Sequence, residues 1–226
     1  MIKKRKKIGI VGGIGPEATG NFYLNLIKKF QKDWLINSNK DYPKIVINSI
    51  PAPELIQKNV SNRNLIPYVL GLKELEKFGV DFIVMVCNTI YLFYNRLRKE
   101  VKIPIIDLEE EVKDFLTKRN IKSITVLGTQ AVIKRGLYKF KNIDSIDLTD
   151  REMEILANAI FNFNKGKEKE KQIEIVKNIA KRYLNQGSEF LLLGCTELDL
   201  MLKKENIPKI SPVDILIKAT IQRLLE

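Results

Sequence analysis

Residues Asp81–Thr89 read DFIVMVCNT, and residues Glu189–Glu197 read EFLLLGCTE. Each stretch has an acidic residue, a phenylalanine, four mostly aliphatic residues, and then a cysteine followed by polar residues. Cys195 follows Cys87 by 108 residues, and the chain contains no other cysteine. A short apolar run of this kind predicts a buried β-strand that ends next to its cysteine.

A second pair of stretches repeats in the same order. Residues Ile8–Gly13 read IGIVGG, and residues Ile124–Thr129 read ITVLGT, 116 residues later. Tyr23 and Tyr138 then follow at nearly matching distances. Two correspondences with similar offsets predict that one α/β unit is present twice.

Strand-like and helix-like stretches alternate along the whole chain. Apolar residues at helical spacing, as in the face of Thr19–Lys32, predict amphipathic helices between the strands. Continuous apolar strands separated by helices indicate parallel sheets covered on both faces, and hence an α/β fold. The predicted strands are Ile8–Gly12, Lys44–Ser49, Asp81–Val86, Ser123–Leu127, Ser145–Leu148 and Glu189–Leu193. The other predicted helices are Leu65–Phe78, Glu110–Lys118, Glu152–Phe163, Ile173–Leu184 and Pro212–Leu225.

The repeats predict two pseudosymmetric α/β halves with parallel sheets. Residues 1–100 form the first half and residues 101–211 the second, and the C-terminal helix (212–226) packs back onto the first half. Ligands of open α/β sheets bind at the carboxyl ends of the strands. Both cysteines are therefore expected to face one active-site cleft between the halves.

Composition excludes several classes of function. The 226 residues carry a net charge of +12 and contain no histidine, which removes His-based metal sites and Ser-His triads. The lysines are spread among acidic residues, without a nucleic-acid-binding signature, and no apolar run reaches the ~20 residues of a membrane helix. We therefore expect no metal site, no nucleic-acid partner and no membrane association. The basic start of the chain lacks the features of a secretory signal, so a cytoplasmic protein is expected.

Two facing thiols suggest acid–base chemistry. A cysteine at a helix start is expected to have a lowered pKa, because the helix N-terminus carries partial positive charge. One thiolate would then remove a proton from a carbon beside a carboxylate, and the opposite thiol would return one to the other face. Backbone N–H groups would stabilise the charge that develops on the carboxylate. This arrangement predicts racemisation without a cofactor.

Other interpretations of the same residues remain open. A free cysteine is commonly an inert, buried small apolar residue. A single thiol could also serve a related isomerase or decarboxylase of a small dicarboxylate as a nucleophile. A third possibility is a carboxylate-binding module without turnover. Tyr91, which follows the first cysteine, fits either a pocket wall or a packed helix.

Four motifs together resemble the aspartate/glutamate racemase family, and most closely its cofactor-independent aspartate racemase branch. They are Ile8–Thr19, Cys87-Asn88-Thr89, Gly128-Thr129-Gln130-Ala131 and Gly194-Cys195-Thr196-Glu197-Leu198. The resemblance implies two α/β halves, racemisation of a small amino-acid or dicarboxylate substrate, no cofactor, and a homodimer. It assigns the acid–base pair to Cys87 and Cys195. Substrate contacts are implied for Asn88, Thr89, Thr129, Thr196, Glu197 and Lys165.

The sequence also departs from the family pattern. Many members have a histidine shortly after the first cysteine, where this chain has Ile90-Tyr91. Many aspartate racemases carry an arginine after a segment that here reads Asn48–Glu54 and contains none. A second hydroxyl is usual where Val132 stands. These changes affect the identity of the substrate more than the type of reaction.

Overall fold

The computed structural model describes residues 6–33, 36–51 and 62–226, and it contains two parallel sheets. The first sheet has the order β2-β1-β3, and the second has the order β5-β4-β6-β7. Every strand pair is parallel, which confirms the predicted α/β class. The strands are β1 (Ile8–Gly12), β2 (Ile45–Ser49), β3 (Phe82–Met85), β4 (Ser123–Gly128), β5 (Asp144–Ser145), β6 (Phe190–Gly194) and β7 (Lys209–Ile210).

Helices follow the strands and agree closely with the predicted amphipathic stretches. The long ones are α1 (Pro16–Asp33), α2 (Ile66–Phe78), α4 (Leu108–Lys118), α6 (Asp150–Asn164), α7 (Lys169–Asn185) and α9 (Pro212–Leu225). The short ones are α3 (Tyr94–Leu97), α5 (Gln130–Lys134), α8 (Thr196–Met201) and the 3₁₀ helices η1 (Asn39–Asp41), η2 (Asn62–Leu65) and η3 (Thr89–Phe93). Apolar periodicity does not predict the short helices, because a helix of one or two turns has too few residues to display a period.

Local capping explains where several helices begin. The Asp107 side chain accepts a hydrogen bond from the backbone N–H of Glu110 at the start of α4. Thr149 and Glu152 form a capping box at the start of α6, and the Ser211 hydroxyl caps α9 ahead of Pro212. These side chains satisfy N–H groups that have no partner within the helix. Helices α4 and α6 begin just before their predicted starts at Glu110 and Glu152, whereas α9 begins at Pro212 as predicted.

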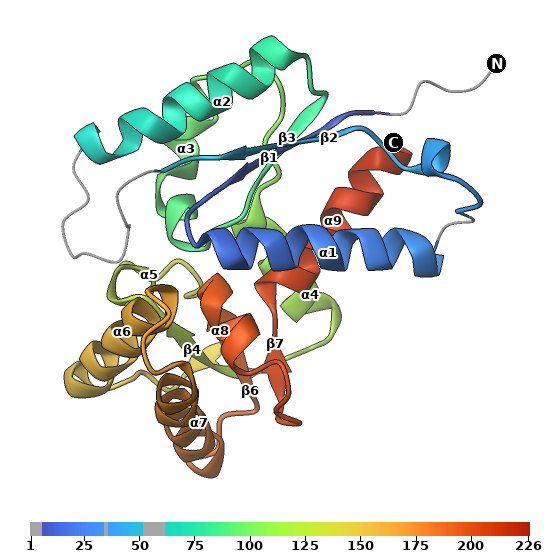
Figure 1. Ribbon diagram of the computed structural model, residues 1–226. Coiled ribbons are helices and arrows are strands. Elements are labelled where there is room, and N and C mark those ends of the chain that lie inside the picture. The colour runs from blue at the N-terminus through green and yellow to red at the C-terminus, as the bar shows by residue number, and fades with distance from the viewer. Residues whose placement is uncertain (1–5, 34–35, 52–61) are drawn as a thin grey trace.

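The two sheets follow the same order of pairing. In the first sheet the central strand β1 lies between β2 and β3. In the second sheet β4 lies between β5 and β6. Ile105 pairs in parallel with Ile83 of β3, as β7 pairs with β6, and the long helices α4 and α9 follow these two pairings. Figure 1 shows the first sheet between α1 and α2, with the second half beyond α1. Helix α9 contacts α1 of the first half as well as α4 and α8.

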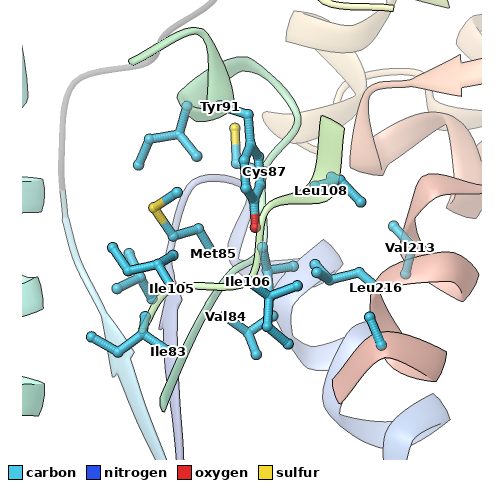
Figure 2. Packing of buried hydrophobic residues seen from close by; sticks show 14 of the residues in the cluster. Ile83, Val84, Met85, Cys87, Tyr91, Ile105, Ile106, Leu108, Val213 and Leu216 are labelled. Carbon is cyan, nitrogen blue, oxygen red and sulfur yellow. The ribbon is translucent and has the colours of Figure 1, made fainter. Parts of the chain in front are cut away.

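The interior is apolar, and it includes the first cysteine. Figure 2 shows Cys87 and Tyr91 beside Met85, in a cluster that also receives Ile106 and, from α9, Leu216. The Tyr91 side chain is 2% exposed. The Tyr91 ring is therefore packed in the core, which agrees with the packed-helix interpretation of this residue.

Two differences from the prediction concern the second sheet. The strand predicted over Ser145–Leu148 is much shorter, because only Asp144 and Ser145 pair with β4. The two-residue strand β7 was not predicted, since so short a run carries no recognisable pattern. Residues Ala52–Glu54, part of the segment without the family's arginine, lie outside the described residues. Among the described residues, no helix has the length and apolarity needed to cross a membrane.

Asp199 of α8 is a partly buried acid that makes stability depend on pH. Burial raises its pKa from 3.8 to about 8, with a smaller contribution from the negative charge of Asp214, while Ser211 and Lys209 oppose the shift. The folded state therefore binds a proton that the unfolded state releases between about pH 4 and pH 8. Stability from this group is complete below pH 4 and is lost as pH rises toward 8.

We expect Asp199→Asn to remove that loss, because an amide stays neutral. The variant should match the wild type in melting temperature near pH 4 and exceed it by several degrees at pH 9. Each kcal/mol corresponds to about 2–4 °C in a domain of this size. Asp114→Asn, at an exposed ion pair with Lys118, is the control and should change little. Equal pH dependence in the Asp199 variant and the wild type would contradict the prediction.

Candidate active site

Cys87 lies just beyond the carboxyl end of β3, and its side chain is 8% exposed. Asn88 is the N-cap of the 3₁₀ helix η3, although its side chain makes no capping hydrogen bond. The sulfur of Cys87 accepts hydrogen bonds from the backbone N–H groups of Ile90 and Thr89 and from the Thr89 hydroxyl. The first thiol thus faces several donors that would stabilise a thiolate.

Cys195 occupies the matching place after β6 and is 6% exposed. It is itself the N-cap of α8, and Thr196 is the first residue of this helix. The Cys195 thiol donates a hydrogen bond to Oε2 of Glu197 over 2.8 Å. Thr196 Oγ1 donates to the same oxygen over 3.2 Å. The second thiol thus faces a carboxylate acceptor as well as the backbone N–H of Glu197, whereas the groups that hydrogen-bond the first are donors.

Hydrogen bonds join the residues after Cys87 to the second half. Thr89 Oγ1 and Thr129 Oγ1 lie 3.1 Å apart, and Thr129 Oγ1 also accepts from the backbone N–H of Val132. The Tyr138 hydroxyl donates to Oδ1 of Asn88. All of these side chains are buried. Each half therefore contributes groups to one polar cluster inside the protein.

The second cysteine approaches the first half through Glu197. Gly15, in the turn between β1 and α1, has a φ of 85°, and a side-chain carbon there would collide with Oε1 of Glu197. A left-handed φ and this close approach both require glycine. The turn between β1 and α1 thus packs against a carboxylate of the other half.

Charged groups that follow β3 and β6 influence one another's pKa values. The charge of Glu197 raises the pKa of Cys87, and the charge of Cys87 raises that of Cys195. These interactions run between residues that follow β3 and residues that follow β6. The predicted approach of the carboxyl ends of the two strands therefore agrees with the interactions in the structure.

The expected lowering of the thiol pKa values was wrong for the protein without a substrate. Burial raises the pKa of Cys87 to about 12, and burial with the Glu197 carboxylate raises that of Cys195 well above its usual value. The backbone N–H groups act in the opposite direction, but they belong to a 3₁₀ helix of five residues and a helix of six. Such short helices provide a small dipole, and desolvation of the thiolate outweighs it.

Lys165 is the one predicted contact that lies apart from this cluster. It caps the C-terminal end of α6, is exposed, and holds its Nζ 3.8 Å from the centroid of the Phe161 ring. Four residues later, Lys169 pairs with Glu17 of α1 at 2.5 Å. The start of α7 thus contacts the first half next to the β1–α1 turn.

Sequence reasoning missed two members of the cluster. Tyr138 was noted only as a repeated tyrosine, and Gly15 only as part of a turn. The Gly15–Glu197 approach depends on how the halves pack together, which no local pattern encodes. The position of Tyr138 nine residues after the Gly-Thr motif could have identified it only through comparison with relatives.

The protein-family model described as Asp/Glu/Hydantoin racemase matches residues 11–220. The chain belongs to this family. This match confirms the prediction that the protein is an isomerase of the racemase type, and it confirms the resemblance of the four motifs to this family. The match spans both halves of the chain.

Individual relatives agree with the family model. The chain is 25% identical to the broad specificity amino-acid racemase RacX of Bacillus subtilis, over 96% of this chain and 98% of that protein. Its fold resembles the Picrophilus torridus aspartate racemase, with a TM-score of 0.81 and 27% identity over 97% and 94% of the two chains. An aspartate racemase homologue from Pyrococcus horikoshii gives a TM-score of 0.75 and 28% identity over 98% and 100%.

Proposed function

We propose that the protein racemises amino acids without a cofactor, with Cys87 and Cys195 as its acid–base pair. The observation that carries the proposal is the opposite setting of the two thiols. Hydrogen-bond donors surround Cys87, whereas the Cys195 thiol donates to Glu197. Racemisation in one direction needs one thiolate and one thiol, and the donors around Cys87 make it the thiol that loses its proton more readily.

The proposed reaction moves two protons. The Cys87 thiolate takes the proton from Cα, and the electron pair of the C–H bond delocalises into the substrate carboxylate. The Cys195 S–H bond then breaks, and its proton adds to the opposite face of Cα. The enzyme is left with a Cys87 thiol and a Cys195 thiolate, which is the form that acts on the other enantiomer.

Substrate binding would bring a positive charge to the two thiols. Burial holds both thiols protonated, because a thiolate is poorly solvated there. The ammonium group of an amino acid brought between them would favour a thiolate and lower its pKa. A buried, water-poor site then strengthens this interaction. The thiols would therefore become reactive only when the substrate is present.

Glu197 would act on Cys195 rather than on the side chain of the substrate. Its Oε2 accepts from Cys195 and Thr196, while Oε1 packs against Gly15. When Cys195 must serve as the base, this carboxylate is the nearest group that can receive its proton. The segment without the family's arginine supports testing neutral as well as acidic amino acids.

The test of the proposed function is incubation in deuterated water with L- and D-amino acids of acidic and neutral side chain. We expect deuterium at Cα and loss of optical activity with at least one pair of enantiomers. Exchange requires no added cofactor. Deuterium exchange with no amino acid in the panel, aspartate and glutamate included, would contradict the proposal.

A further inference from the structure

We propose that Tyr138 is a positioning residue, which orients the Asn88 amide toward the substrate carboxylate. This inference rests on the proposed function, because it names what the second half contributes to the same site. It begins from a buried hydrogen bond between the halves, in which the Tyr138 hydroxyl donates to Oδ1 of Asn88. The two side chains are 2% and 1% exposed.

The direction of this hydrogen bond is fixed by chemistry. Burial raises the pKa of Tyr138 well above 10, so the phenol keeps its proton throughout the physiological range. A buried phenol needs an acceptor for that proton. Oδ1 of Asn88 can accept it, whereas Nδ2 is only a donor. Tyr138 therefore holds the amide with its oxygen toward the second half.

The other end of the amide is left without a partner. Nδ2 of Asn88 is buried and forms no hydrogen bond to any of the described residues. Burial of an amide donor without an acceptor is unfavourable, and such groups are rare in native structures. Asn88 adjoins Cys87 in the chain, so its free N–H groups lie beside a proposed acid–base group. A substrate carboxylate is an acceptor of the required chemistry.

The hydroxyl groups of Thr89 and Thr129 likewise connect the second half to the Cys87 thiol. Thr129 accepts from the Val132 N–H, so its own hydroxyl proton can be donated to Thr89. The Thr89 hydroxyl in turn donates to the sulfur of Cys87. Residues of the second half thus determine the orientation of both residues that follow the first cysteine. Beside the second cysteine the corresponding hydrogen bond joins adjacent residues, because the Thr196 hydroxyl donates to Glu197.

The arrangement has a specific consequence for Tyr138→Phe. Without the phenol, Asn88 can rotate its amide and present Oδ1, an acceptor that repels a carboxylate. We expect KM for the racemised amino acid to rise about 10- to 30-fold, the effect of one lost or misdirected hydrogen bond, with kcat within about threefold of the wild type. The melting temperature should change little, because the ring remains in place.

A double-mutant cycle separates positioning from general damage. In an Asn88→Ala background, Tyr138→Phe should have no further effect on KM, because there is no amide to orient. Tyr183→Phe is the matched control. Its hydroxyl is equally buried, donates to Glu152 over 2.7 Å and lies in the second half away from Asn88. It should leave KM unchanged. An equal loss from Tyr138→Phe in both backgrounds, or no loss in either, would overturn the proposal.

A measurement without turnover keeps this inference distinct from the proposed function. In protein labelled with ¹⁵N-asparagine, the side-chain NH₂ signals of Asn88 are assigned by their disappearance in Asn88→Ala. We expect Tyr138→Phe to move these signals and Tyr183→Phe to leave them in place. If the wild type racemises no amino acid, the proposed function fails while this result still decides the role of Tyr138. Unmoved Asn88 signals in Tyr138→Phe would overturn it.

Discussion

Replacing either cysteine by serine is expected to lower racemisation by at least about 10³-fold, in the upper range for the loss of an acid–base group. A serine hydroxyl is much less acidic than a thiol, so it can neither form the required anion nor donate its proton readily. Both Cys87→Ser and Cys195→Ser should show the loss. Because the two enantiomers are equal in free energy, kcat/KM must fall equally in both directions.

The single variants should nevertheless retain hydrogen exchange of one enantiomer each. The remaining thiol can still remove the proton that faces it and return a solvent-derived one to the same side. Cys87→Ser should therefore exchange one enantiomer, and Cys195→Ser the opposite one. This opposite handedness is what two bases on two faces of Cα require.

The measurement is deuterium incorporation from deuterated water into each pure enantiomer, followed by mass spectrometry and chiral chromatography. The double variant Cys87→Ser/Cys195→Ser is the control, and it should exchange neither. Unchanged melting temperatures would show that the buried sites tolerate serine. If one variant kept full racemisation, or if both lost exchange of the same enantiomer, the two-thiol mechanism would be wrong.

Much of this site could be predicted from the sequence because it depends on local pattern and on repetition. The apolar runs before Cys87 and Cys195 fix where two strands end, and their matching contexts place both thiols at equivalent positions. The Gly-Thr motif likewise places Thr129 just after β4, where its hydroxyl meets that of Thr89. Parallel pairing aligns these ends along one edge within each sheet, and the packing of the two halves brings the two edges together.

What could not be predicted depends on packing between the halves. The thiol pKa values reflect burial, and they rise because the helices after the cysteines are too short to offset desolvation. The partner of Asn88 is Tyr138, 50 residues away, and Glu197 meets Gly15 across the halves. Such contacts leave no periodic trace in the sequence.

Glu197→Gln is expected to separate two roles of this carboxylate, which are to raise the thiol pKa values and to receive the proton of Cys195. Its charge raises the pKa of both thiols, and its hydrogen bond with Cys195 raises that pKa further. Removing the charge should therefore lower both pKa values, with the larger change at Cys195. At any pH below those values a larger fraction of each cysteine is then a thiolate, and alkylation by iodoacetamide should begin at lower pH than in the wild type.

Racemisation should change in the opposite sense. Glutamine can accept a hydrogen bond from the Cys195 thiol, but it cannot receive the proton when Cys195 acts as the base. We expect kcat/KM to fall by about 10²-fold, the lower end of the range for an acid–base group, although the thiolates form more easily. Faster alkylation together with slower racemisation would show that Glu197 accepts a proton and does not only raise the thiol pKa values.

The experiment follows alkylation of the Cys87 and Cys195 peptides by mass spectrometry from pH 6 to pH 10, beside the racemisation rate. Glu17→Gln is the control, because Glu17 is exposed and pairs with Lys169, and it should alter neither measurement. Cys195 is the more informative site, since both effects of Glu197 act on it while only the charge acts on Cys87. If Glu197→Gln left the alkylation profile of Cys195 where it is in the wild type, the carboxylate would not control that thiol. The hydrogen bond of 2.8 Å between them would then have no part in the reaction.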